Sequence, residues 1–115
     1  MNLLTIEVAT DQAINARIVR AIERNEPQPP VYFFDSEEAL FDSLTSRRIA
    51  ILKALSGAKP MSLRTLTRRV KSDLRTVHAD VERLVFIGLI DKTAQGQLHF
   101  PYDGIRLELA WAVAA

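Results

Sequence analysis

Hydrophobic residues recur at two different spacings along the chain, and the change of spacing predicts its helices and strands. Residues 3–8, LLTIEV, alternate apolar and polar side chains, which is typical of a short strand. Residues 12–24 carry apolar side chains every four positions, which predicts a helix that Asp11 would cap. The repeating residues are Ile14, Ile18 and Ile22.

Proline and aromatic residues predict the next boundaries. The segment 25–30, NEPQPP, ends the first helix because proline cannot continue it. The run 31–34, VYFF, is aromatic and β-branched and predicts a second strand. Asp35 or Ser36 then precedes a short helical pattern as its cap.

From residue 45 onward, three capped helical patterns follow one another. Thr45 or Ser46 begins the first, Ser62 the second and Asp73 the third, and residues 71–73 form a short break before the third. Gly88 stands where a helix ends in a left-handed residue. The residues predicted to face inward are Ile49, Leu52 and Leu55, then Leu63, Leu66 and Val70, then Leu74, Val77, Val81 and Leu84.

The pattern of the carboxyl-terminal part predicts strands. LIDKT and LHF flank AQGQ, which predicts a hairpin with Gly96 in its turn. Residues 105–113 alternate and predict a strand, although alanines also allow a helix beyond Leu107. The alternating residues are Ile105, Leu107, Leu109, Trp111 and Val113.

Three helices with a tight turn before the third, followed by a hairpin, form the order of a winged helix-turn-helix. The sequence therefore predicts an α+β fold, with this domain over residues 36–115. Residues 1–35 would be a strand-helix-strand arm. The apolar material of the arm and of 105–113 suggests a homodimer interface, with strands pairing between chains, but the arm could instead fold back on its own domain.

Charge is distributed unevenly along the chain. Residues 1–45 contain three basic and eight acidic residues, a net charge of −5, whereas residues 46–115 contain twelve and six, a net charge of +6. A basic carboxyl-terminal part favours a polyanionic partner such as double-stranded DNA. The acidic arm is expected to lie away from the phosphates.

The basic residues between 62 and 83 lie opposite the apolar faces, either as an ordinary solvated surface or as a DNA-binding face. In the second interpretation, the helix 73–88 enters the major groove and Arg75 reads a base edge, while Arg68, Arg69 and Lys71 meet phosphates. The wing tip has neither Arg nor Lys, so few contacts are expected from it. The candidate DNA-binding residues are Arg64, Arg68, Arg69, Lys71, Ser72, Arg75, Thr76, His78, Ala79, Arg83 and Lys92.

Catalytic and metal-binding patterns are weak. His78 and Glu82 are four residues apart on one predicted helix, but the chain has only one other histidine and no cysteine. Asp80 lies in the middle of the third helix, where a carboxylate facing DNA would be repelled, so it is expected to pair with a basic side chain such as Arg83, Arg47 or Arg48. No enzyme, cofactor or membrane association is therefore expected, and the absence of cysteines and of a signal-peptide pattern fits a cytoplasmic protein.

The sequence also resembles a family of prokaryotic winged-helix regulators that are predicted to bind DNA. The resemblance covers about residues 40–109 and is carried by LTSRRIAILKAL, VHADVERL with the following GLI, and PYDGIRLEL. It implies a winged fold and a regulatory role, most simply that of a dimeric repressor. Some relatives are similar to antitoxins encoded beside a small toxin, which leaves open an alternative role in neutralising a partner protein.

Overall fold

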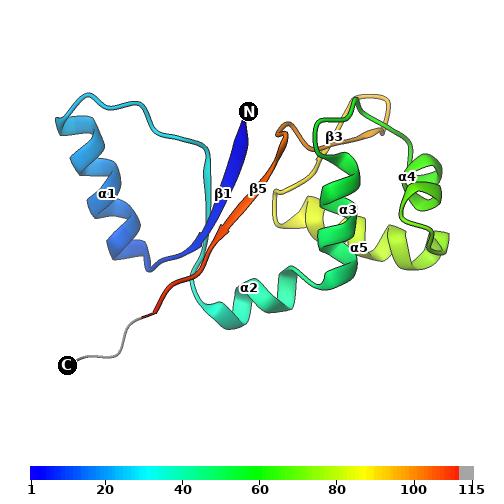
Figure 1. The fold of residues 1–115 in the computed structure, drawn as a ribbon, viewed down its shortest axis with the longest axis horizontal. Coiled ribbons are helices and arrows are strands. Elements are labelled where there is room, and N and C mark those ends of the chain that lie inside the picture. The colour runs from blue at the N-terminus through cyan, green and yellow to red at the C-terminus, as the bar shows by residue number, and fades with distance from the viewer. Residues whose placement is uncertain (112–115) are drawn as a thin grey trace.

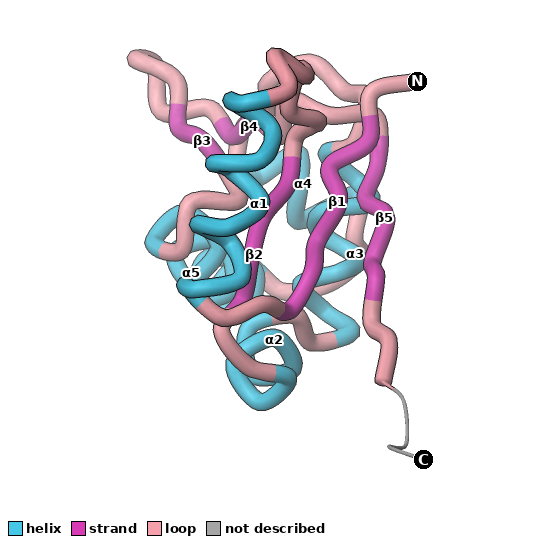
Figure 2. Tube along the Cα trace, turned by 90° about the vertical axis from the view of Figure 1, so that its left-hand side faces the viewer, coloured by secondary structure: helices cyan, strands magenta, loops and turns pink. Residues whose placement is uncertain are grey.

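The computed structural model describes residues 1–111, which form three layers (Figure 1). The middle layer is a parallel sheet in the order β2-β1-β5, built from β1 (Leu3–Val8), β2 (Val31–Phe34) and β5 (Gly104–Glu108). Helix α1 (Asp11–Glu23) lies on one face of the sheet, and the remaining helices lie on the other. Figure 2 shows the same order from α1 toward α3 and α4.

The helical layer is a winged helix-turn-helix, as the order of the elements predicts. Backbone hydrogen bonds between Met61 and Leu98 form an isolated antiparallel bridge beside the hairpin of the wing. The elements are α2 (Glu37–Ser43), α3 (Ser46–Leu55), α4 (Leu63–Arg69) and α5 (Leu74–Phe86), followed by the hairpin of β3 (Asp91–Lys92) and β4 (Leu98–His99).

One hydrophobic core joins the sheet to the helical layer. Leu4 and Ile6 of β1 and Phe34 of β2 are buried against the winged domain. The helices and the wing supply the other side of this core, with Ile51, Leu52, Leu55, Leu66, Val77, Val81, Leu84, Leu98 and Phe100. The amino-terminal strands are therefore packed on the winged domain, and the division of the chain near residue 35 stays a prediction.

Side-chain caps begin the helices largely where the sequence places them. Thr45, Ser62 and Asp73 each accept a hydrogen bond from a backbone amide in the first turn. Ser36, one of two candidates, caps α2. The prediction that Asp11 caps α1 is wrong, because Thr10 accepts from the amide of Ala13 at 3.2 Å and Asp11 is the first helical residue.

One residue predicted to face inward is exposed, and the apolar face of α1 is not covered within the chain. Leu74 is 43% exposed because it begins α5 and lies to one side of the buried residues Val77 and Val81. On α1, only Ala21 is buried, while Ile18 and Ile22 are exposed to solvent. The regular spacing of the isoleucines predicts the helix correctly, and a dimer contact through this face stays a prediction.

The strand predicted over 105–113 is shorter in the structure. It begins at Gly104 and ends at Glu108, beyond which residues 109–111 have no regular structure and 112–115 lie outside the described residues. Strand β5 pairs with β1 of the same chain, Leu3 opposite Gly104 and Glu7 opposite Glu108. The amino-terminal arm thus folds back on its own domain.

Candidate nucleic-acid interface

The turn between α4 and α5 depends on one left-handed residue. After α4 ends at Arg69, Val70 keeps a helical backbone, and Lys71 has φ +53°. Residues other than glycine rarely adopt a positive φ, because their Cβ comes too close to the backbone carbonyl oxygen. The reversal at Lys71 lets Asp73 cap α5 only four residues after the end of α4 at Arg69.

Replacing Lys71 by glycine is expected to stabilise the fold. Glycine adopts positive φ without the steric cost, so the free energy of unfolding should rise by about 0.5–1 kcal/mol. Lys71→Ala is the matched control, because it removes the same charge without relieving the backbone. Urea unfolding that gives equal stability for the two variants would contradict the expected strain.

Asp80 fixes α5 against α3 through two arginines. Its carboxylate is buried and accepts from Nε of Arg47 and from Nε of Arg48, each at 3.0 Å. Arg48 also donates Nη1 to the carbonyl oxygens of Asp42 and Ser43, at 2.9 and 3.1 Å. The pairing expected from the sequence is therefore confirmed, and one buried charge joins the end of α2, α3 and α5.

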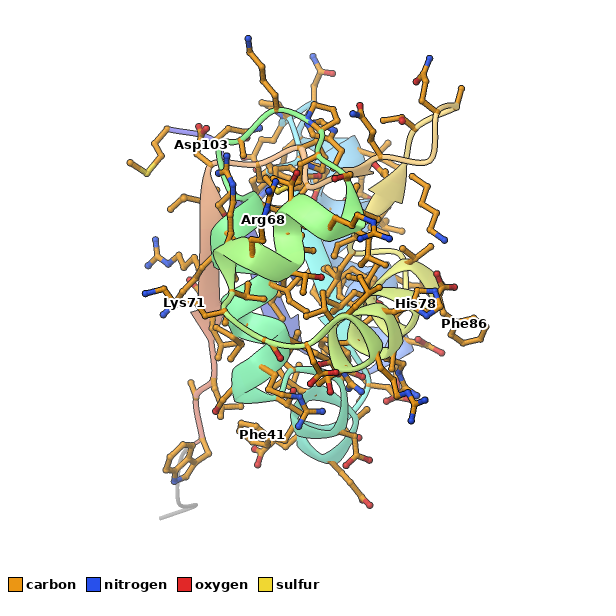
Figure 3. All side chains as sticks on the ribbon, turned by 90° about the vertical axis from the view of Figure 1, so that its right-hand side faces the viewer. Phe41, Arg68, Lys71, His78, Phe86 and Asp103 are labelled. Carbon is orange, nitrogen blue, oxygen red and sulfur yellow. The ribbon has the colours of Figure 1, made fainter. Side chains whose placement is uncertain are left out.

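Six basic side chains are exposed on α4, the turn and α5. None of them forms an ion pair with a carboxylate among residues 1–111, whereas Arg17, Arg47, Arg48, Lys92 and Arg106 do. Figure 3 looks onto this side of the molecule, with Arg68 on α4 and Lys71 in the turn. The six residues, called the basic face below, are Arg64, Arg68, Arg69, Lys71, Arg75 and Arg83.

The first turn of α5 is held by its own cap. Asp73 accepts from the amide of Thr76 at 2.9 Å and from its hydroxyl at 2.8 Å. These hydrogen bonds from the Thr76 amide and hydroxyl hold the pKa of Asp73 below its usual range, so the carboxylate remains charged. The Thr76 hydroxyl is thus engaged within the protein, and its methyl group is what remains for a base contact. Ser72 and Ala79 are exposed on either side of this turn.

An acidic residue engages two other candidates. Glu82 accepts from Nζ of Lys92 at 2.7 Å, and its Oε1 lies 3.6 Å from Nε2 of His78. The hydrogen bond and charge of Lys92, and then the charge of His78, lower the pKa of Glu82. We therefore expect Lys92 to attract phosphate less strongly than the basic face does.

The structure adds Leu74 to the candidate residues. Its exposed side chain lines a shallow groove with Arg64, Thr65 and Arg68 between α4 and α5. An apolar side chain among arginines can contact a thymine methyl group or the sugar edge of a groove. Its position in the sequence could have indicated this exposure. Leu74 directly follows the cap Asp73, and the first residue of a helix lies at its end, away from the core.

Within the described residues, no cluster of three or more His, Asp or Glu side chains could hold a metal ion. No helix in that part of the chain is long and apolar enough to cross a bilayer.

A match to a family model shows to which protein family the chain belongs. The model of the family HVO_A0114 matches residues 43–107, which is more than half of the sequence. The chain belongs to the HVO_A0114 family. The matched region runs from the end of α2 to β5, so it contains the winged domain, and it coincides closely with the resemblance found in residues 40–109.

Two further comparisons concern the whole sequence and the structure of this HVO_A0114 protein. No curated protein matches it by sequence. A crystal structure of the multiple antibiotic-resistance repressor (MarR) from Listeria monocytogenes 4b F2365 is similar, with a TM-score of 0.48 and 18% sequence identity. The similarity covers 78% of this chain and 59% of the repressor, so the chain spans less than two thirds of the length of that protein.

Proposed function

We propose that this protein is a sequence-specific regulator that binds double-stranded DNA with the first turns of α5 in the major groove. The distribution of charge around α4 and α5 supports the proposal most strongly. The basic face carries six exposed cations that form no ion pair with a described carboxylate. Of the acidic groups nearby, Asp80 is buried, Glu82 is paired with Lys92, and Asp73 is exposed but engaged as the cap of α5.

The residues of the basic face have two expected roles. Arg75 lies in the first turn of α5 and is exposed, so its guanidinium can reach a guanine edge. Arg68 and Arg69 end α4 and, with Lys71 in the turn, are expected to bind phosphate oxygens. A short recognition helix reads few base pairs, so we further propose that two copies bind half-sites about 34 Å apart.

Two substitutions separate base reading from phosphate binding. On a site selected from random DNA, Arg75→Ala should cost about 1–3 kcal/mol and relax the preference at one base pair. Arg69→Ala should weaken binding to all duplexes alike and reduce the slope of log K against log salt by about one. Fluorescence anisotropy over a series of salt concentrations measures both.

Arg20→Ala is the control, because Arg20 is an exposed arginine on α1, on the opposite side of the sheet. It should leave affinity and salt slope unchanged. Equal losses from Arg75→Ala on selected and random DNA would reject base reading. No loss from either substitution would make the basic face an ordinary solvated surface.

A further inference from the structure

Strand β5 leaves one edge of the sheet open. In the order β2-β1-β5 it pairs with β1 on one side only, and no other described strand lies beside its second edge. Figure 2 shows β5 at the outer edge of the sheet. An open edge carries backbone amides and carbonyls that can accept another strand.

The apolar alternation of this segment extends past the strand. Leu107, Leu109 and Trp111 continue the pattern of Ile105, yet β5 ends at Glu108. Its pairing with β1 stops at Glu108, opposite Glu7, one residue before β1 itself ends at Val8. Leu107 is 46% exposed and Trp111 is 79% exposed, so a single chain does not bury these two apolar side chains.

We propose that β5 pairs antiparallel with β5 of a second copy, around a two-fold axis at Leu107. In this register Arg106 lies opposite Glu108 of the partner subunit, and Ile105 lies opposite Leu109 of the partner subunit. Directly opposed residues of an antiparallel pair lie on the same face, so charges meet opposite charges and apolar side chains meet each other. The ion pair now formed within one chain, Arg106 to Glu108 at 3.0 Å, exchanges its members across the axis.

The charges select this register over its neighbours. A two-fold axis perpendicular to the sheet passes between two copies of the same residue. The neighbouring registers are therefore those in which the axis lies at the residue before or after Leu107. Centring on Arg106 places arginine against arginine, and centring on Glu108 places glutamate against glutamate. Like charges directly opposite are unfavourable, so Leu107 is the centre that the sequence supports.

The same register covers an apolar groove. A pocket of about 480 Å³ lies between β5 and α3 and is lined by Ile49, Leu52, Ile105 and Leu107, with Lys53 and Asp103 at its polar side. Trp111 of the partner subunit comes opposite Asp103 and, by alternation, lies on the face of Leu107. Continuing the strand to Trp111 thus places an exposed indole beside an open apolar groove.

The pairing extends the proposed DNA-binding role without depending on it. A two-fold axis perpendicular to the sheet keeps both winged domains on one face of a continuous six-stranded sheet, and both α1 helices on the other. Two half-sites on one duplex require recognition helices on the same side of a dimer. All tests of the interface are made without DNA, so failure of the interface and failure of DNA binding are separate results.

Charge reversal and mixing test the register. Arg106→Glu and Glu108→Arg each create two like-charge pairs in a homodimer, so each should raise the dimer dissociation constant roughly tenfold or more. Mixing the two variants restores opposite charges at both pairs, so the mixture should dimerise like the unaltered protein. Sedimentation velocity from about 1 to 200 µM measures this. Loss of the ion pair within each chain cannot explain recovery on mixing.

A cysteine cross-link tests the centre. The chain has no cysteine, and opposed Cα atoms in an antiparallel pair are about 4.5–5.5 Å apart, within disulfide range. Leu107→Cys should form a disulfide-linked dimer under mild oxidation. Ile18→Cys on α1 is the control, because Ile18 is 43% exposed and Leu107 is 46% exposed. This variant should remain monomeric on non-reducing electrophoresis.

Three outcomes would overturn the proposal. These are a strictly monomeric protein throughout the concentration series, a mixture that behaves like its separate components, and faster cross-linking through Ile18→Cys. The last result would place the interface on α1 instead. Circular dichroism and thermal melting of every variant show whether a loss of dimer reflects unfolding, and the double variant Arg106→Glu with Glu108→Arg should dimerise again.

Discussion

Replacing Ile6 by alanine is expected to lower the free energy of unfolding by about 2–5 kcal/mol. Ile6 has no exposed surface and lies at the centre of β1, between the sheet and the helical layer. Truncation removes several buried methyl and methylene groups and leaves a cavity, because the neighbouring strands and helices cannot close it. Urea unfolding followed by circular dichroism measures the loss.

Ile22→Ala is the matched control, since Ile22 is 73% exposed on α1 and loses the same atoms. Its effect should stay within about 0.5 kcal/mol. Equal, small effects of both substitutions would indicate that residues 1–35 are an independent arm. Point substitution is a cleaner experiment than deleting the arm, because deletion removes Leu4, Ile6 and Phe34 from the core together.

Asp80→Ala is expected to destabilise the protein by about 3–5 kcal/mol, as removal of one partner from a buried ion pair does. The carboxylate is buried, and Arg48, whose side chain is only 17% exposed, would keep its charge without a counter-ion. Arg47 is 63% exposed and would be hydrated instead, so most of the loss comes from Arg48. Equilibrium unfolding of the variant provides the measurement.

Glu82→Ala provides the control on the same helix. Its carboxylate is about half exposed and paired with the exposed Lys92, so its loss should change the free energy of unfolding far less than the loss of Asp80 does. If Asp80→Ala were as mild, the arginines would be sufficiently hydrated without the carboxylate. The double variant Asp80→Ala with Arg48→Met should recover stability, because it removes both buried charges together.

Local features of the fold followed from the sequence because their causes are local. Ser62 and Asp73 cap the helices that they precede, and Gly96 has the positive φ that the hairpin turn requires. A basic partner for Asp80 was expected because a carboxylate on a helix that faces DNA would be repelled by the phosphates. The three inward faces of α3, α4 and α5 also follow from periodicity, apart from Leu74.

Features that depend on distant neighbours could not be read from the sequence. Residues 3–8 and 105–113 both had strand patterns, but the pattern does not state which strands pair or in which direction. The end of β5 at Glu108 and the exposure of Ile18 and Ile22 both depend on which elements lie beside them in space. The positive φ of Lys71 has no sequence signal because glycine would be the usual residue there.

The parallel pairing of β1 with β5 has a consequence for how the chain folds. Leu3 lies opposite Gly104, so the sheet joins segments about one hundred residues apart, whereas α3, α4 and α5 contact one another across short turns. Closing so large a loop is slow, so we expect the helical contacts, whose loops are short, to form first. During synthesis β2 can pair with one edge of β1 early, but the other edge of β1 stays open until residues 104–108 have been made.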